Sequence, residues 1–250
     1  MGAFFYAKKL LYLRKSFSMT ITTISDTHNK HNLIPKEYLS GGDVIIHAGD
    51  MSSRGMEYEI DSFLNWYETL PYTHKILIAG NHDFFFENAS KYIIEDKLKK
   101  YPNITYLNDS GVDIEGIKIW GSPVQPYFHD WAFNRKGEDI KKHWDLIPSD
   151  IDILIVHGGP KGKGDLNLTL RGEDVGCPYL TETIDNRLNN LKCFIHGHIH
   201  EGYGTYEDEN GVLYVNTSVL DVRYVIKNKP QMFYMDTNNK KINKNFYEKR

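Results

Sequence analysis

The stretch Lys-Ile-Leu-Ile-Ala-Gly-Asn-His-Asp, residues 75–83, joins a short apolar run to a polar turn. A brief apolar run that contains β-branched residues and ends at a glycine is typical of a buried strand. Asn81, His82 and Asp83 follow this glycine directly, and their side chains can bind a metal ion or transfer a proton. The stretch therefore predicts a strand that presents reactive groups at its carboxyl end.

The same succession of apolar run and polar turn occurs at four other places in the chain. These runs are Thr20–Ser25, Val44–His47, Ile151–Val156 and Cys193–His196. Between the runs, apolar residues recur at helical spacing, as in Ile60, Phe63, Leu64 and Tyr67 and again in Ile184, Leu188 and Leu191. Alternating strands and helices predict an α/β fold with helices packed on the sheet faces.

Two further segments have the pattern of antiparallel strands. Residues 104–121 contain turns at 109–111 and 115–116, and residues 203–234 turn at 209–211. The chain contains no internal repeat and no low-complexity linker. We therefore expect one domain over residues 19–250.

Residues 1–18 differ in composition from the rest of the chain. They carry Lys8, Lys9, Arg14 and Lys15, and the first acidic residue of the sequence is Asp26. We expect a basic extension that is not part of the core. The alternative is an amphipathic arm that touches a membrane surface.

Composition excludes several classes of protein. The 30 Lys and Arg against 33 Asp and Glu give a formal charge of −3, which argues against stable nucleic-acid binding, because such domains are usually basic. Two cysteines, Cys177 and Cys193, cannot build a disulfide framework, so we expect a reducing, cytoplasmic location. No apolar run approaches the roughly 20 residues of a transmembrane segment.

The polar turns contain carboxylates, imidazoles and one carboxamide. In open α/β sheets, ligands bind beyond the carboxyl ends of the strands, so we expect these turns to converge. Such donors, without thiolates, suit divalent metals of intermediate hardness such as Mn²⁺, Fe or Zn²⁺. Their number is sufficient for two ions, and paired ions can stabilise both the attacking and the leaving oxygen of a phosphoryl displacement.

Taken in order, the motifs Asp-x-His, Gly-Asp, Gly-Asn-His-Asp, His and Gly-His-x-His resemble the calcineurin-like metallophosphoesterase superfamily. The resemblance extends from Thr20 to about Asp236. It is greatest to the metallophosphoesterase-domain-containing phosphodiesterases of the fetal-brain type, which share runs that here occupy residues 78–82, 144–148, 152–154 and 197–204. The resemblance implies a four-layer αββα sandwich of two mixed β-sheets, a dinuclear metal site and hydrolysis of phosphoesters, often cyclic nucleotides.

The family pattern also implies a role for each motif residue. Asp26, His28 and His200 would hold one metal, and Asn81, His157 and His198 the other, with Asp50 bridging both. A hydroxide between the ions would attack phosphorus, while His82 would bind the phosphate and protonate the leaving oxygen. Asp83 would hydrogen-bond His82 and orient its ring. Gly159 replaces a proline that is frequent in the family, and His198 is present where some relatives have glycine and lose activity.

Other polar residues have weaker patterns. We expect His47 and His196 to lie behind the ligands or in the core, and His31, His74 and His143 to be solvated. His129 and Trp131 belong to an aromatic loop that could line a base pocket, although ordinary loop packing explains it equally well. Arg171, in the glycine-rich residues 158–176, could contact substrate or be an ordinary surface arginine.

The leading hypothesis is a phosphodiesterase of small diesters that contains two divalent ions. We favour Mn²⁺, with Fe, Zn²⁺ or Mg²⁺ as alternatives, and cyclic nucleotides, above all 2′,3′-cyclic ones, as substrates. The alternatives are a phosphomonoesterase, protein phosphatase or nuclease on the same scaffold, and a metal-binding scaffold with little catalysis. The sequence contains no feature that sets an oligomeric state.

Overall fold

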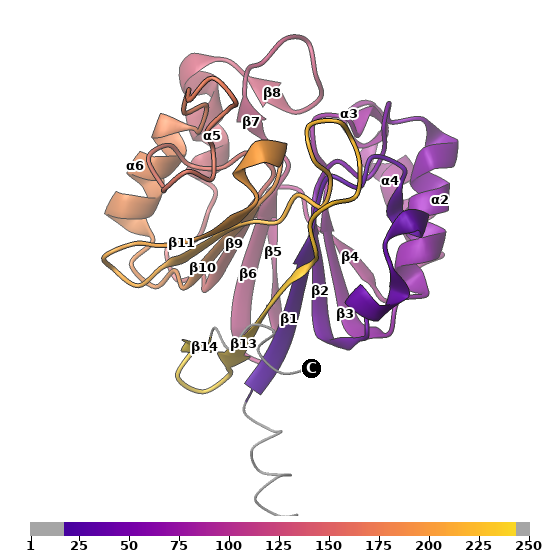
Figure 1. Ribbon diagram of the computed structural model, residues 1–250, viewed down its shortest axis with the longest axis horizontal. Helices are drawn as coiled ribbons and strands as arrows, with labels where there is room; N and C mark the ends of the chain where they lie inside the picture. The colour runs from indigo at the N-terminus through magenta and orange to yellow at the C-terminus, as the bar shows by residue number, and fades with distance from the viewer. Residues whose placement is uncertain (1–17, 244–250) are drawn as a thin grey trace, which may run out of the picture.

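The computed structural model describes residues 18–243 (Figure 1). The predicted basic extension, residues 1–18, lies outside this range except for Ser18, which begins the first strand. None of the helices among residues 18–243 is long and apolar enough to span a bilayer.

The first sheet has the strand order β14-β13-β1-β2-β3-β4. Four of its strands are parallel neighbours, and β13 runs antiparallel to β1. The strands are β1 (Ser18–Ile24), β2 (Gly42–Ala48), β3 (Tyr72–Ile78), β4 (Ile104–Tyr106), β13 (Gln231–Asp236) and β14 (Ile242–Asn243). The predicted first three strands are confirmed, and each is a few residues longer at its start.

The second sheet has the order β11-β12-β10-β9-β6-β5 and is also mixed. Its strands β6, β9, β10 and β12 are parallel, and antiparallel hairpins close both edges. Its strands are β5 (Ser110–Ile114), β6 (Ile117–Ser122), β9 (Ile153–Val156), β10 (Cys193–His196), β11 (Gly204–Glu207) and β12 (Leu213–Asn216). A small pair, β7 (Gln125–Pro126) and β8 (Asn134–Arg135), stands apart from both sheets.

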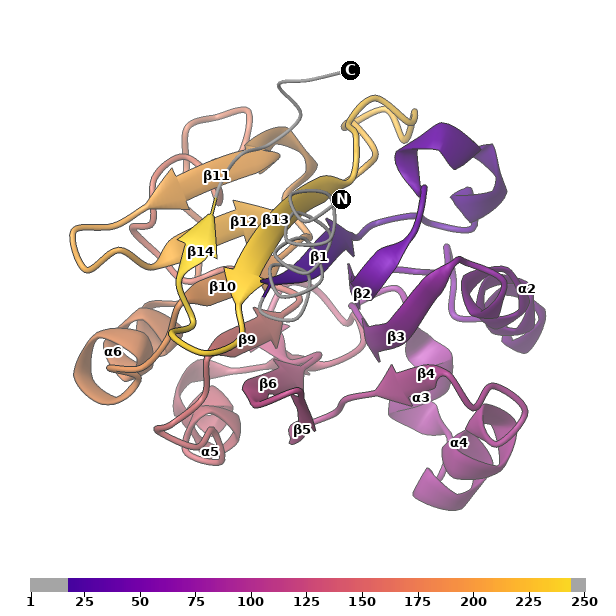
Figure 2. The ribbon, with the colours of Figure 1, turned by 90° about the horizontal axis from the view of Figure 1, so that it is seen from below.

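The two sheets pack face to face and helices cover their outer faces (Figures 1 and 2). The α2, α3 and α4 helices lie on the first sheet, and α5 and α6 on the second. The helices are α2 (Glu57–Glu68), α3 (Phe84–Asn88), α4 (Lys91–Leu98), α5 (Lys141–Trp144) and α6 (Pro178–Arg187), with 3₁₀ turns η1 (His31–Leu33), η2 (Lys36–Tyr38), η3 (Gly137–Ile140) and η4 (His200–Gly202). This is the four-layer αββα sandwich that the family resemblance implies.

Apolar residues fill the space between the sheets. Ile21, Ile46 and Ile76 of the first sheet share one buried cluster with Ile155 and Ile195 of the second. Strands buried on both faces need near-continuous apolar sequences, which explains why the runs in these strands do not alternate. The two sheets therefore share one core.

The α2 helix follows from its sequence. Ile60, Phe63, Leu64 and Tyr67 are buried on the face toward the first sheet. At the amino end, the Glu59 carboxylate accepts hydrogen bonds from the backbone N–H of Met56 and Arg54, which satisfies donors that no helical carbonyl reaches. Helical periodicity is therefore sufficient to place this helix against the sheet.

Two antiparallel predictions are only partly correct. The hairpins β5–β6 and β11–β12 form at the predicted turns, 115–116 and 209–211. However, β4 pairs in parallel with β3, and β13 pairs with β1, so both belong to the first sheet. The turn residues at 107–109 and 217–230 thus carry the chain from one sheet to the other, which local sequence does not distinguish from a hairpin.

Candidate metal centre

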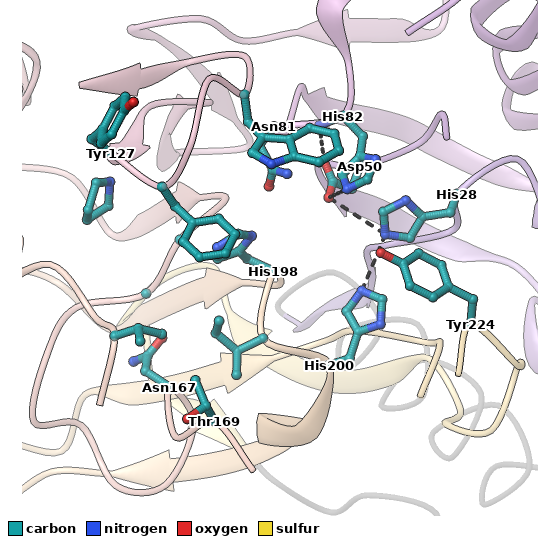
Figure 3. A pocket seen from close by; sticks show the side chains of 17 residues that line it. His28, Asp50, Asn81, His82, Tyr127, Asn167, Thr169, His198, His200 and Tyr224 are labelled. Carbon is teal, nitrogen blue, oxygen red and sulfur yellow. Dashed lines mark hydrogen bonds and ion pairs between the residues drawn. The ribbon is translucent and has the colours of Figure 1, made fainter. Parts of the chain in front are cut away.

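All five predicted turns meet at one edge of the sandwich, where the carboxyl ends of strands from both sheets lie together (Figure 3). The first sheet supplies Asp26 and His28 after β1, Asp50 after β2, and Asn81 and His82 after β3. The second sheet supplies His157 after β9 and His198 and His200 after β10. Convergence of this kind follows from parallel strands, whose carboxyl ends share one edge.

One group of donors contains Asp26, His28 and His200. The Nε2 atoms of the two histidines are 3.3 Å apart. Asp26 Oδ1 lies 3.5 Å from His200 Nε2 and 4.0 Å from His28 Nε2. These three ligand atoms face a common point, as the family pattern implies.

A second group contains Asp50, Asn81, His157 and His198. His157 Nε2 lies 3.3 Å from Asp50 Oδ2 and 3.1 Å from Asn81 Oδ1, and His198 shares the cluster with Asp50 and His157. Asp50 Oδ2 is also 3.7 Å from His28 Nε2, so this carboxylate lies between the two groups. The position fits a bridging ligand.

Hydrogen bonds behind the donors prepare them for cations. His157 Nδ1 donates to the Ala48 carbonyl at 2.8 Å, and His200 Nδ1 donates to the Asp221 carbonyl at 3.0 Å. Because a carbonyl only accepts, each ring presents Nε2 to its carboxylate, the arrangement that metal-binding histidines use. Ser218 Oγ donates to Asp26 Oδ2 at 2.7 Å and orients that carboxylate. Two divalent ions fit this donor set.

The pKa values of the donors reflect how deeply each donor is buried and how close it lies to an opposite charge. Burial alone would raise the pKa of Asp50 and lower that of His157, but their proximity outweighs this effect. The pKa of Asp50 is held well below its usual range, and that of His157 rises to about 9. In contrast, burial lowers the pKa of His28 to about 4 and that of His198 to about 3, so both are neutral imidazoles at neutral pH.

The backbone is strained at the donors. Asp26, His28, Asp50 and His198 have φ angles of 54°, 39°, 57° and 67°, the left-handed region that side chains other than glycine rarely adopt. Gly80 allows a close approach, since a Cβ there would collide with the Asp50 carboxylate and the His157 ring. Strain that coincides with donors indicates a functional site, because only the surrounding packing maintains it.

His82 lies at the edge of the cluster, where its ligand atom is close to those of His28 and Asp50. Its Nδ1 donates to the Ser53 carbonyl at 2.8 Å, which leaves Nε2 facing the cluster, 4.0 Å from Asp50 Oδ2. The Trp131 ring packs on its ring at 4.3 Å, and the His28 ring meets it edge-on at 4.5 Å. The ring is thus held on three sides, with its Nε2 free to meet a ligand.

The predicted contact between Asp83 and His82 is wrong. The Asp83 carboxylate instead accepts hydrogen bonds from the Gly80 N–H at 2.8 Å, the Ser52 N–H at 2.9 Å and the Ser52 hydroxyl at 2.6 Å. It therefore joins the turn after β2 to the turn after β3. Burial, followed by the charge of Asp50, raises the pKa of Asp83 to about 6. The prediction failed because adjacent side chains at a turn point in different directions.

A cavity of about 440 Å³ opens in front of the cluster. Trp131 lines it, whereas His129 and Arg171 are exposed and do not contribute to the lining. Sequence reasoning missed Tyr224, whose ring lies 4.8 Å from His28 and 5.2 Å from His200 (Figure 3). A positive φ of 59° at such a bulky residue is unusual, but no sequence pattern predicts it.

Of the five remaining histidines, two are buried as predicted, and three are less exposed than predicted. His47 and His196 are fully buried behind the cluster, as predicted. His31 was expected at the surface but is fully buried, because its ring packs against Phe63 and Trp66. His74 is partly buried, and His143 is partly buried in an ion pair with Asp109.

Residues 19–202 match the family model described as calcineurin-like phosphoesterase. This match covers most of the chain and contains all seven proposed ligands. The chain belongs to the calcineurin-like phosphoesterase family. Metallophosphoesterase domain-containing protein 1 of Homo sapiens is 39% identical to this phosphoesterase over 234 residues, which are 86% of this chain and 70% of the human protein. A UPF0046 protein of Caenorhabditis elegans is 33% identical over 213 residues, 79% of this chain and 74% of that one.

Solved structures share the fold of this phosphoesterase. A dimetal phosphatase from Danio rerio has a TM-score of 0.53 at 11% identity, covering 87% of this chain and 92% of that one. TT1561 of Thermus thermophilus has a TM-score of 0.56 at 15% identity, with 90% and 97% covered. Family membership makes this protein a phosphoesterase of the hydrolase class, and the family implies a site for two divalent ions where the His and Asp clusters lie.

Proposed function

We propose that this phosphoesterase is a metal-dependent phosphodiesterase of small diesters, with cyclic nucleotides, above all 2′,3′-cyclic ones, as the favoured substrates. One observation carries the proposal. A cavity of about 440 Å³ joins the donor cluster to aromatic walls formed by Tyr127, Phe128 and Trp131. Aromatic rings can stack on a base or aryl group, and a cavity of this volume suits a small molecule.

We further propose that the seven donors hold two ions in the groups described above. Asp26, His28 and His200 would bind one ion and Asn81, His157 and His198 the other, with Asp50 between them. Divalent cations here would act as Lewis acids that activate water and neutralise charge on the phosphate. We favour Mn²⁺, since imidazole, carboxylate and carboxamide donors without thiolate suit a metal of intermediate hardness.

In this proposal His82 acts on the leaving group. Its Nδ1–H is engaged with Ser53, so Nε2 is the atom that meets the substrate. A proton on Nε2 would bind a phosphate oxygen and then pass to the departing oxygen as the bond to phosphorus breaks. Trp131 packs on the ring and limits its rotation. Asp83 supports the turns that carry Asp50 and His82 rather than the His82 ring itself.

A substrate panel tests the proposed function. Metal-stripped protein reloaded with Mn²⁺ is assayed on bis(p-nitrophenyl) phosphate, p-nitrophenyl phosphate, 2′,3′-cyclic and 3′,5′-cyclic AMP, and a phosphopeptide. We expect both classes of diester to be cleaved faster than the monoester and the peptide. Phosphopeptide turnover without diester turnover would replace the proposal with the phosphatase alternative. Binding of Mn²⁺ without turnover of any substrate would favour the metal-binding scaffold.

We also propose a cytoplasmic location. Cys177 and Cys193 are both buried with free thiols in the structure, which fits a reducing compartment. Fractionation of cells that produce the tagged full chain tests this proposal.

A further inference from the structure

The cavity has two chemically different sides. Figure 3 shows His28, Asp50 and His200 on one side and Tyr127, Asn167 and Thr169 on the other. The donors His28, Asp50, Asn81, His198 and His200 line the cavity together with His82. The rest of the lining is neutral and includes the apolar Pro126, Phe128, Val175 and Ile199. A bound diester would place its phosphate on the first side and its organic part on the second.

Among the described residues, no lysine or arginine lines this cavity. Several cations lie close to lining residues without lining the cavity themselves. Lys136 Nζ lies 4.0 Å from the centre of the Tyr127 ring, Lys30 donates to the Tyr224 carbonyl, and Arg223 pairs with Asp221 at 3.2 Å. Arg171 is exposed on the loop that carries Thr169 and Val175, and it does not line the cavity.

Two carboxylates also lie near the loops that carry lining residues. Asp130 accepts a hydrogen bond from the Tyr127 hydroxyl at 3.0 Å, and Glu201 accepts one from the Leu170 N–H at 3.0 Å. Neither acid lines the cavity, and Asp130 shares its partner Tyr127 with the cation of Lys136. A second anionic group on the substrate would meet mainly apolar side chains, because the lining contains no Arg or Lys of the kind that usually binds a phosphate.

We propose that the cavity selects phosphodiesters with one phosphate and an otherwise uncharged organic part, and excludes those that carry a second anionic group. This inference rests on the proposed diesterase function and narrows its substrate class. Nucleoside cyclic phosphates and aryl diesters are accepted, whereas pyrophosphates, oligonucleotides and nucleotides with a further phosphate are discriminated against.

The local packing supports a preformed neutral side. Asn167 is 1% exposed, and its amide nitrogen donates to the Pro160 carbonyl at 2.7 Å. Gly159 makes room for this side chain, since a Cβ at 159 would collide with it. The loop that carries Asn167 is therefore held against the turn at Gly159 and Pro160. A charged part of a substrate would have to enter the cavity without displacing this loop.

A matched pair of substrates tests the proposal. One is adenosine 2′,3′-cyclic phosphate and the other is the same compound with a 5′-phosphate, both assayed on the Mn²⁺-loaded full chain by chromatography of the products. We expect kcat/KM to be about 10- to 100-fold lower for the 5′-phosphorylated compound, because the extra anion is desolvated without a partner. Values within threefold of each other would overturn the inference.

A variant that adds a positively charged side chain to the cavity lining gives a second test. Val175→Lys places an ammonium group on the neutral side, and we expect it to narrow the difference between the two substrates by about tenfold. Val222→Lys is the matched control, because Val222 is equally exposed, at 43% against 42%, but does not line the cavity. An equal effect of both variants would show that overall charge, rather than this wall, discriminates the substrates. Circular dichroism checks the fold of both variants.

Two further outcomes separate the inference from the function on which it rests. If neither cyclic phosphate nor bis(p-nitrophenyl) phosphate is cleaved, the proposed diesterase function fails. If the diesters without a 5′-phosphate are cleaved and Arg171→Ala slows only the 5′-phosphorylated one by tenfold or more, the exposed arginine binds the second anion and the inference is wrong.

Discussion

The cavity has a floor, formed by the metal-ligand candidates at the strand ends, and a wall, formed by the neutral side chains of the surrounding loops. These two parts are built in different ways. Strand-end turns of both sheets form the floor, where buried donors such as Asp50 and His157 are hydrogen-bonded from behind. Loops form the wall, and Tyr127 and Phe128 there are 43% and 56% exposed. The floor has strained backbone and closely spaced charges, whereas the wall has neutral side chains. We infer that the floor determines the reaction and the wall determines which substrates reach it.

The largest expected effect comes from removing the carboxylate shared by both groups of the floor. Asp50→Ala should lower kcat/KM at least about 10³-fold, because the loss of several kcal/mol of charge stabilisation corresponds to that factor. Elemental analysis should find close to two metals per chain in the wild type and fewer than one in the variant. Asp96→Ala, on the exposed face of α4, is the control. A fully active Asp50→Ala protein would remove the dinuclear assignment.

A second variant separates His82 from the donors of the floor. General acid catalysis contributes about 10²–10⁴-fold and matters most for poor leaving groups. His82→Ala should therefore lose about 10³-fold on 2′,3′-cyclic AMP and much less on bis(p-nitrophenyl) phosphate, with its metals retained. His198→Ala should instead lose metal and slow both substrates, with partial recovery at high Mn²⁺. Equal losses on both substrates in His82→Ala at full occupancy would leave His82 as a phosphate anchor only.

A third prediction concerns the helix layer that supports the floor. Burial lowers the pKa of His31 to about 4, below its value of 6.5 in the unfolded chain. The unfolded state binds the proton first, so stability is complete above pH 6.5 and falls as the pH drops toward 4, by up to about 3 kcal/mol.

Urea unfolding at pH 7.5 and pH 4.5 measures this contribution. We expect His31→Phe, which keeps a ring against Phe63 and Trp66, to lose less stability than the wild type between these two pH values. An identical pH dependence in both proteins would show that His31 does not titrate as its burial implies.

The smallest expected effect concerns the wall. Phe128→Ala should raise KM for cyclic nucleotides about tenfold and leave kcat nearly unchanged, because stacking on a base contributes about 1–3 kcal/mol. His129→Ala and Arg171→Ala, whose side chains do not line the cavity, should change KM less than twofold for the same substrate. A loss of kcat in Phe128→Ala would contradict the inference that the floor determines the reaction and the wall determines only which substrates bind.

The sequence alone determined the floor. Each donor follows a short apolar run, so Asp26, Asp50 and Asn81 could be assigned to strand ends from local pattern, and parallel strands place such ends at one edge. The helix over Ile60 and Tyr67 follows from periodicity in the same way. These features depend on contacts close in sequence, which one segment encodes by itself.

Only the tertiary structure decided the partners of these residues. Ser53, rather than Asp83, holds His82, and Tyr224 reaches His28 and His200 from a loop that no motif marks. The sheet to which β4 and β13 belong, and the burial of His31, were likewise set by packing between distant segments. Such contacts depend on how whole layers are positioned relative to one another. The absence of lysine and arginine among the described residues that line the cavity could therefore be recognised only from the folded arrangement of both sheets and their loops.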